Sequence, residues 1–270
     1  METGTSASMG KFAVILPAAG RSSRFGDPKQ KKIYAELEGR AVWLRALDPF
    51  LTHGEVEQII VAIAPEDREL FDRRYHDKAA FLSLDVIDGG AERSDTVARA
   101  LERVRPVCQF VAIHDAARPC LTENMVSAVF SAARDHGAAL LATPVSDTIK
   151  RTGDDRFTTE TVPRRDLYLA QTPQVFRRDW LEAAYARRAQ ADADVTDDTQ
   201  LVEALGHRCV IVPGSPLNLK LTTQEDLKLA TAILRLQSSS PRETSGHPFA
   251  DEAAMWADLP NLKASDLFDS

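Results

Sequence analysis

The sequence FAVILPAAGRSSRFGDPKQ occupies residues 12–30, close to the start of the chain. Its first five residues are apolar, and Pro17 with the small residues Ala18, Ala19 and Gly20 follows them. A short apolar run closed by proline and glycine is typical of a buried strand that leads into a turn. We therefore predict a strand at 12–16 in the interior of a sheet, followed by an open loop.

Buried strands and amphipathic helices alternate after this loop. The patterns predict strands at 58–64, 82–87, 110–113 and 138–142, and helices at 41–51, 66–75, 94–104 and 122–136, the last with Thr122 as its N-cap. Strands separated by helices imply right-handed crossovers. The sequence thus predicts an α/β protein with a three-layer, Rossmann-like architecture and a mostly parallel sheet.

The pattern changes between Pro144 and Gln174. Two segments rich in strand-forming residues, 147–150 and 157–162, flank a Gly-Asp-Asp turn at 153–155, which predicts a hairpin arm at about 145–170. A two-stranded ribbon is marginal alone. We therefore expect the arm to protrude and to form a homodimer by packing against a second subunit.

The α/β pattern then resumes, and the composition changes near the end. Helices are predicted at 178–190, 197–205 and 223–236, with a strand at 209–212. Residues 238–270 are rich in serine and proline and carry six acidic residues against two basic ones. We predict one domain at 9–237 and a flexible acidic tail at 238–270.

Composition excludes several classes of protein. The 270 residues are 44% hydrophobic and 27% charged, as in ordinary folded proteins, and the net charge of −7 argues against nucleic-acid binding through a basic face. The three cysteines lack a C-x-x-C pair, which argues against a disulfide scaffold and fits a reducing compartment. The sequence contains no apolar run long enough to cross a bilayer, and its first residues do not resemble a secretory signal. We therefore expect a cytoplasmic protein that binds no membrane. Either Met1 or Met9 is the start.

The loop after the first predicted strand is suited to binding phosphates. Ligands of open α/β sheets bind beyond the carboxyl ends of the strands. Ala18, Ala19 and Gly20 are small enough to let backbone N–H groups approach phosphate oxygens. Five cations gather within twelve residues of an acidic chain: Arg21, Arg24, Lys29, Lys31 and Lys32. The loop matches neither the Walker nor the dinucleotide motif, so ATPase and dehydrogenase functions are disfavoured.

Five segments together resemble one known family. They are PAAGRSSRFGDPKQ at 17–30, DGGAERSDTV at 88–97, HDAARP at 114–119, TPVSDTIK at 143–150 with QTPQ at 171–174, and NLKLTT at 218–223. In this order they resemble the motifs of the 2-C-methyl-D-erythritol 4-phosphate cytidylyltransferases, which belong to the sugar-nucleotide-type nucleotidyltransferases and serve non-mevalonate isoprenoid synthesis. The resemblance covers about residues 12–237. The resemblance implies the fold of the sugar-nucleotide-type nucleotidyltransferases. It also implies that the protein transfers CMP from CTP to a polyol phosphate and releases pyrophosphate.

The resemblance also implies roles for individual residues. Arg24 and Lys29 match the groups that stabilise charge on the reacting phosphate, a role that suits a planar guanidinium and a compact ammonium. Residues that match positions around the nucleotide are Ala18, Ala19, Gly20, Gly89, Gly90, Arg93, Thr96 and Asp115. Asp115 is also expected to hold Mg²⁺ on the triphosphate or to meet the ribose hydroxyls. Residues that match positions around the polyol phosphate are Arg118, Thr148, Arg164 and Lys220, with Arg164 reaching a neighbouring subunit's site.

Two positions depart from the family's pattern, and two other functions remain open. Ser22 stands where a glycine is usual, and Ala91 where an acidic residue often follows the glycine pair. A ribitol-5-phosphate cytidylyltransferase shares much of the loop set, and a nucleotide-binding module without turnover would keep the pocket. The presence of both Arg24 and Lys29 favours an enzyme over the binding module.

Overall fold

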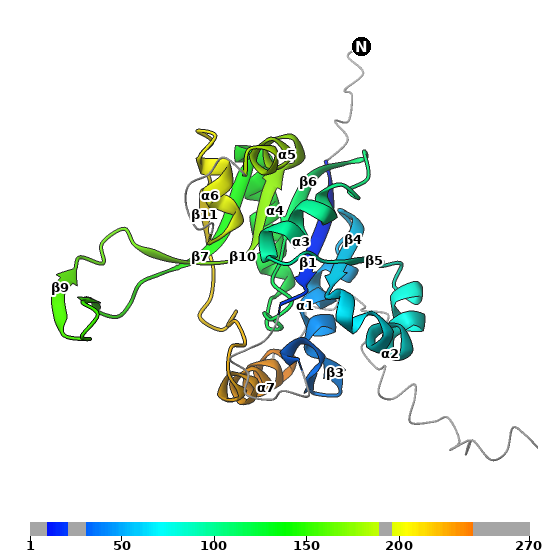
Figure 1. Cartoon of the computed structure of the whole chain (residues 1–270), viewed down its shortest axis with the longest axis horizontal. Helices are drawn as coiled ribbons and strands as arrows, with labels where there is room; N and C mark the ends of the chain where they lie inside the picture. Colours follow the sequence, from blue (N-terminus) through cyan, green and yellow to red (C-terminus); the bar gives the residue numbers. More distant parts are fainter. Residues whose placement is uncertain (1–9, 21–30, 189–195, 240–270) are drawn as a thin grey trace, which may run out of the picture.

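A seven-stranded sheet forms the centre of the computed structural model, which describes residues 10–20, 31–188 and 196–239 (Figure 1). The strands lie in the order β11-β7-β10-β6-β1-β4-β5. Their bounds are β1 Lys11–Ala18, β4 Val56–Ile63, β5 Asp85–Asp88, β6 Cys108–Ile113, β7 Ala138–Pro144, β10 Tyr168–Arg177 and β11 Val210–Pro213. Neighbouring strands are parallel except at β10, which runs antiparallel to both β6 and β7. The predicted mostly parallel α/β sheet is confirmed.

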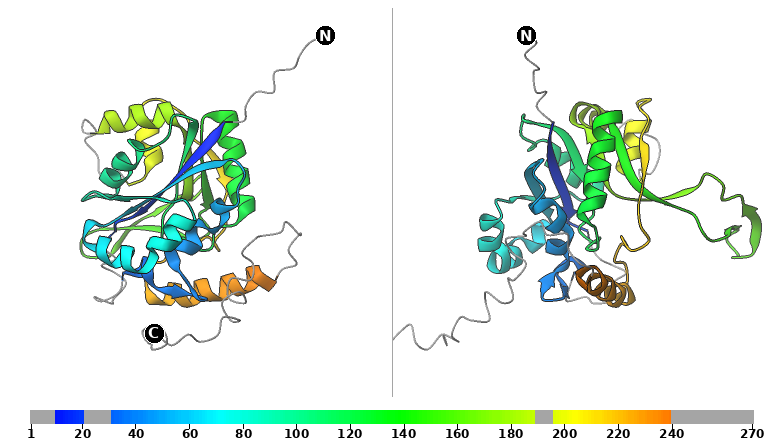
Figure 2. Two further views of the ribbon diagram at one scale, coloured as in Figure 1. Left: turned by 90° about the vertical axis from the view of Figure 1, so that its right-hand side faces the viewer. Right: turned by 180° about the vertical axis from the view of Figure 1, so that it is seen from behind.

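Helices cover both faces of this sheet and complete the predicted three layers (Figure 2). On one face lie α1 Val42–Leu51, α2 Arg68–Phe81 and α4 Glu123–His136, and on the other α3 Arg93–Leu101, α5 Arg178–Ala186 and α6 Asp198–Glu203. The central strand β1 serves both layers, because Phe12, Val14 and Leu16 face the first group while Ala13 and Ile15 face the second. All five side chains are fully buried, which explains why this strand is apolar throughout.

A third apolar cluster joins the last helix to the rest of the body. Helix α7 Gln224–Ser239 packs through Ala230 and Ile233 against Leu37 and Cys120. Leu37 belongs to a small hairpin formed by β2 Glu36–Leu37 and β3 Arg40–Ala41. A single helical turn, η1 Lys32–Tyr34, precedes this hairpin, and a second one, η2 Pro65–Asp67, follows β4. This packing brings the loop before α7 to the carboxyl end of the sheet. No helix in the described ranges is both long and apolar enough to cross a membrane.

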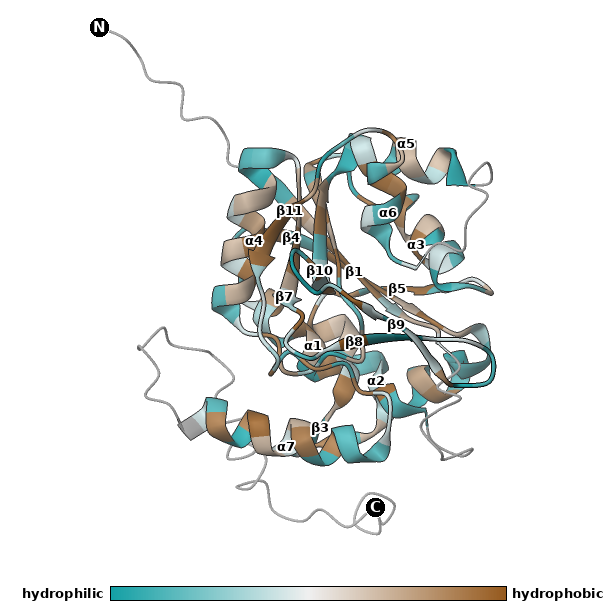
Figure 3. Ribbon diagram, turned by 90° about the vertical axis from the view of Figure 1, so that its left-hand side faces the viewer, coloured by the Kyte–Doolittle hydropathy of each residue, from teal (hydrophilic) through white to brown (hydrophobic). Residues whose placement is uncertain are grey.

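The predicted arm is present as a separate two-stranded sheet. Strands β8 Ile149–Thr152 and β9 Thr158–Val162 pair antiparallel and project from the body (Figure 1). Most of their residues are exposed, and Figure 3 shows the arm strands largely in hydrophilic colours. A hydrogen bond from the Val145 amide to the Leu167 carbonyl, at 3.0 Å, closes the base of the arm.

Several predicted boundaries need correction. Strand β1 continues through Pro17 to Ala18, so proline does not end it. Strand β10 was not predicted at all, because its outer residues Tyr168 and Leu169 are exposed and its buried part contains glutamines and a proline. Helix α7 runs to Ser239, so the predicted start of the tail at Ser238 falls within a helix. The remainder of that tail lies outside the described residues, and its flexibility stays a prediction.

Candidate active site

A pocket opens where the carboxyl ends of β1, β5 and β6 meet, at the edge of the sheet where α/β proteins bind ligands. Residues from four of the five sequence motifs line it: Pro17, Ala18, Ala19, Gly20, Gly90, Ala91, Glu92, Arg93, Thr96, Asp115, Ala116, Ala117 and Lys220, together with Lys32 and Ile33. Segments far apart in the sequence thus converge on one cavity. Of the predicted nucleotide-binding residues, all except Gly89 line it directly.

The glycine pair after β5 packs tightly against the first loop. A Cβ atom on Gly89 would lie 2.6 Å from Ala19 Cβ, and one on Gly90 would lie 2.3 Å from Asp95 Cβ. The buried hydroxyl of Thr96 accepts a hydrogen bond from the Gly90 amide and donates one to the Glu92 carbonyl, both at 3.0 Å. The glycines are therefore needed for packing as well as for access to a ligand, and Thr96 fixes the turn that forms this wall.

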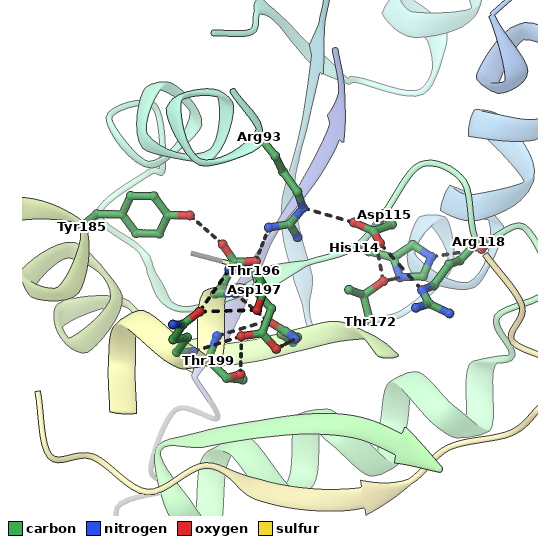
Figure 4. Close-up of polar contacts among 12 residues, drawn as sticks. Arg93, His114, Asp115, Arg118, Thr172, Tyr185, Thr196, Asp197 and Thr199 are labelled. Atoms are coloured by element: carbon green, nitrogen blue, oxygen red, sulfur yellow. Dashed lines mark hydrogen bonds and ion pairs between the residues drawn. The ribbon is translucent and has the colours of Figure 1, made fainter. Parts of the chain in front are cut away.

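Asp115 is the electrostatic centre of the pocket (Figure 4). Its carboxylate lies 2.7 Å from Lys220 Nζ, 3.3 Å from Arg93 Nε and 3.8 Å from Arg118 Nε. Burial alone would raise the pKa of this carboxyl, but Arg93, Lys220 and Arg118 outweigh burial and hold the pKa well below its ordinary value. Asp115 is therefore an anion that three cations share.

A chain of hydrogen bonds beneath Asp115 fixes the orientation of its backbone. The Asp115 amide donates to Thr172 Oγ1 at 3.0 Å, and that hydroxyl lies 3.1 Å from His114 Nδ1. His114 Nε2 lies 3.1 Å from the Arg118 carbonyl, which can only accept, so Nε2 carries the proton and Nδ1 accepts from Thr172. Burial lowers the pKa of His114 to about 4, which agrees with a neutral ring.

The loop that carries Lys220 is fastened to the HDAARP motif. Arg118 Nη1 donates to the Asn218 carbonyl at 2.7 Å, and the Leu221 amide donates to the Ala117 carbonyl at 2.8 Å. The Asn218 side chain is fully buried and donates to the Thr172 carbonyl at 3.0 Å. Arg118 was expected to bind a substrate phosphate. In the structure its guanidinium is mostly buried and braces this loop, so the phosphate role stays a prediction.

Sequence reasoning missed one charged residue beside the pocket. Arg93 Nη1 lies 2.8 Å from the carboxylate of Asp198, a fully buried residue in the first turn of α6. Tyr185 donates to the same carboxylate at 2.6 Å. The sequence TDDTQ at 196–200 contains no signal for this contact, because Arg93 and Asp198 lie far apart in the chain.

The predicted site residues on the arm lie away from the pocket in a single chain. Thr148 precedes β8 and is exposed, and Arg164 follows β9 and donates to the Ser146 carbonyl at the foot of the arm. Figure 1 shows the arm extending away from the body. Neither residue lines the cavity that Asp115 and Lys220 line.

The cations of the first loop do not all face the pocket. Lys31 pairs with Asp67 at 2.8 Å and with Glu66 at 3.0 Å, so its charge is neutralised by carboxylates from a later part of the chain. Lys32 lines the pocket, and its ammonium donates to the Leu221 carbonyl at 3.0 Å. The predicted catalytic residues Arg24 and Lys29, and the departure at Ser22, lie outside the described residues. The other departure, Ala91, lines the pocket.

Within residues 10–20, 31–188 and 196–239, two residues with carboxylates line the pocket, Asp115 and Glu92. No group of three or more His, Cys, Asp or Glu side chains gathers at a metal-binding distance within those ranges. Mg²⁺ commonly keeps several waters and binds one or two carboxylates together with substrate phosphates. The site therefore fits an ion that would arrive on the triphosphate and that Asp115 would hold.

Comparisons with known proteins agree with the motifs. The family model described as 2-C-methyl-D-erythritol 4-phosphate cytidylyltransferase matches residues 12–236. The chain is 43% identical to the protein of that name from Rhodopirellula baltica, over 82% of this chain and 94% of the relative. It is 37% identical to the one from Pelotomaculum thermopropionicum, over 88% and 100% of the two chains. The crystal structure of the Thermus thermophilus enzyme of the same name superposes with a TM-score of 0.69 at 32% identity, covering 82% and 98%.

Proposed function

Because the chain belongs to the 2-C-methyl-D-erythritol 4-phosphate cytidylyltransferase family, we infer that it transfers CMP from CTP to 2-C-methyl-D-erythritol 4-phosphate. The products are 4-diphosphocytidyl-2-C-methyl-D-erythritol and pyrophosphate, in the non-mevalonate route to isoprenoids. The observation that carries this inference is the convergence of the family's motifs on one pocket at the carboxyl end of the sheet.

The reaction needs positioning and neutralisation more than acid–base chemistry. The attacking phosphate is already an anion, and it must approach a triphosphate that repels it. Arg93, Lys32 and Lys220 line the pocket and supply positive charge, while Ala18, Ala19 and Gly20 leave backbone accessible. We propose that Arg24 and Lys29 add the charges that stabilise the pentacoordinate phosphorus.

Magnesium is proposed as the cofactor. The ion would neutralise the triphosphate and orient its phosphates when it is bound. Asp115 would hold it, and Arg93 and Lys220 flank that carboxylate on either side. These neighbours hold the pKa of the carboxyl well below its ordinary value, so Asp115 is ionised at neutral pH.

A homodimer formed through the arm is proposed as the working unit. The arm and its foot expose large apolar side chains: Phe157 is 74% exposed, Leu169 59% and Tyr168 48%. A surface of this kind favours contact with another chain. Since Thr148 and Arg164 lie on the same arm, a partner chain would be able to bring them to the polyol phosphate of the opposite pocket.

The cytoplasm is the proposed compartment. Cys108, Cys120 and Cys209 are all free thiols in the described chain. Unpaired cysteines suit a reducing environment. Burial raises the pKa of Cys120 to about 12, so this thiol is unreactive.

One assay separates the proposed activity from its alternatives. The protein is mixed with CTP, Mg²⁺ and either 2-C-methyl-D-erythritol 4-phosphate or ribitol 5-phosphate, and pyrophosphate release is measured. Release with the first substrate alone is expected. Release with ribitol 5-phosphate alone would identify the ribitol enzyme, and CTP binding without release from either would identify a binding module.

A further inference from the structure

Arg93 is held from two sides by carboxylates that belong to different parts of the fold. Its Nε lies 3.3 Å from Asp115 Oδ1, and its Nη1 lies 2.8 Å from Asp198 Oδ2 (Figure 4). Burial alone would lower the pKa of Arg93, but Asp198 and Asp115 raise it above its ordinary value. The shorter contact is to Asp198, so the main anchor of Arg93 lies outside the pocket.

Asp198 is itself fixed by hydrogen bonds to residues that do not line the pocket. Its side chain is 1% exposed, and its second oxygen accepts from the Tyr185 hydroxyl at 2.6 Å. Its backbone amide donates to Gln174 Oε1 at 3.1 Å, which ties the start of α6 to strand β10 of the main sheet. A buried carboxylate with both oxygens occupied and its backbone fastened has little freedom to move.

We propose that Asp198, fixed by Tyr185, is a positioning residue that sets the guanidinium of Arg93 for nucleotide binding. The proposal rests on the inferred role of Arg93 at the CTP pocket. Asp198 does not line that pocket, whereas Arg93 does. Asp198 therefore acts through Arg93 and not on the nucleotide directly.

The reason for a second carboxylate lies in the charge balance of the pocket. Without Asp198, the guanidinium of Arg93 would have Asp115 as its remaining carboxylate partner and would turn toward it. Asp115 also pairs with Lys220 at 2.7 Å, so the two cations would compete for one anion. By holding Nη1, Asp198 keeps Arg93 at Oδ1 of Asp115 and leaves Oδ2 to Lys220, so the two cations stay apart on the pocket wall.

The test compares four substitutions in the full-length protein. Asp198→Asn keeps the shape of the side chain and removes its charge, and Tyr185→Phe removes only the hydroxyl that fixes it. Arg93→Gln reports the role of Arg93 itself. Asp197→Asn is the control for the packing of α6: the neighbouring carboxylate accepts from the Gln200 amide at 3.1 Å and from Gln174 Nε2 at 3.0 Å, and it makes no contact with Arg93. Asparagine caps helices as well as aspartate does.

The measurements are the Kd of CTP by calorimetry, the KM of each substrate, and the melting temperature. We expect Asp198→Asn to weaken CTP binding about tenfold and Tyr185→Phe about threefold, as losses of charge-assisted contacts do. The KM of the polyol phosphate should stay within about twofold. Combining Asp198→Asn with Arg93→Gln should weaken CTP binding no further than Arg93→Gln alone, because one residue acts through the other.

Several outcomes would overturn the proposal, and they point to different errors. Unchanged CTP binding in Arg93→Gln would remove Arg93 from the nucleotide site. A loss in Arg93→Gln without one in Asp198→Asn, or additive losses in the double variant, would leave the site intact and reject the positioning role. Equal losses in Asp197→Asn and Asp198→Asn would assign the effect to the fold of α6. If Asp198→Asn fails to fold, unchanged CTP binding in Tyr185→Phe rejects the proposal.

Discussion

Lys220 Nζ lies 2.7 Å from Asp115 Oδ2 and joins the loop before α7 to the loop that follows β6. The Lys220 side chain is 42% exposed whereas that of Asp115 is 11% exposed, so the ammonium stands at the mouth of the pocket. Arg93 and Arg118 also face this buried carboxylate, so it stays paired without Lys220 and the loss of this one contact costs little stability. Its importance lies in where it places a positive charge.

Lys220→Gln should therefore impair catalysis more than folding. We expect kcat/KM for the polyol phosphate to fall by about tenfold to a hundredfold, since one cation that faces the incoming anion is lost. The melting temperature should change little. Steady-state kinetics and thermal denaturation measure the two effects, with Lys228→Gln on the exposed face of α7 as the control. Equal kinetics in the two variants would remove Lys220 from the site.

Lys29→Ala should lower kcat by a factor of about 10²–10³, as the loss of other groups that stabilise transition-state charge does. The matched control is Lys31→Ala, because Lys31 is already neutralised by Glu66 and Asp67. Single-turnover kinetics with saturating CTP and Mg²⁺ measure the chemical step. A kcat for Lys29→Ala equal to that of Lys31→Ala would contradict the catalytic assignment.

Mixed dimers test whether one site uses two chains. Lys29→Ala and Arg164→Ala subunits should each be weakly active alone. After random reassembly in equal amounts, about a quarter of the sites should be complete if Arg164 serves the partner's pocket. Pyrophosphate release from the mixture is the measurement. An Arg164→Ala effect on CTP affinity alone would argue against the assignment, and Arg151→Ala, whose side chain pairs with Glu160 on the arm, is the control.

The stability of the protein should fall between pH 7 and pH 4 because of His114. Its pKa is about 4 in the fold, lowered by burial, against 6.5 when unfolded. The unfolded chain therefore binds the proton more readily in this window, and stability is lost as the pH drops below 6.5. The loss should reach about 3 kcal/mol at pH 4. Urea unfolding at several pH values measures it. The pH dependence should shrink in His114→Gln, and an unchanged dependence would show that other groups cause it.

Gly137→Ala should destabilise the fold more than Gly206→Ala. Both glycines have positive φ values, of 86° and 85°. A Cβ on Gly137 would lie 2.3 Å from the Trp180 ring, whereas one on Gly206 would meet nothing within 4 Å. Backbone strain alone costs about 1–2 kcal/mol, and the clash adds about 1–3 kcal/mol at Gly137. Chemical denaturation of both variants measures the difference. Equal losses would mean that the Trp180 ring moves aside freely.

The alternation of apolar strands and amphipathic helices was enough to predict the layers of the fold. The N-cap at Thr122 was also correct, since its hydroxyl accepts from the Met125 amide. Strand β10 was missed because its buried residues Gln171, Thr172 and Gln174 are polar. Each is satisfied by hydrogen bonds to segments remote in sequence, such as Ser215, His114 and Asp197. The spacing of apolar residues along the sequence reveals which apolar side chains are buried, but it does not reveal buried polar side chains such as these.

The candidate site, like the fold, was predictable from the sequence only in part. The small residues and cations of the first loop pointed to a phosphate site, which Ala18 lines, and the family resemblance added Gly90 and Lys220 to it. The pairing of Arg93 with Asp198 was not predictable, because it depends on how α3 and α6 meet on one face of the sheet. The neutralisation of Lys31 by Asp67 was hidden for the same reason.

The position of the arm bears on how such proteins diversify. The chain leaves the sheet after Pro144 and returns at Tyr168, and these two residues are paired in adjacent strands. The whole excursion thus interrupts what would otherwise be an ordinary β-turn connection between β7 and β10. Insertions and deletions there alter no strand order and no crossover, so the length of the projection is able to vary between relatives while the sheet beneath it stays the same.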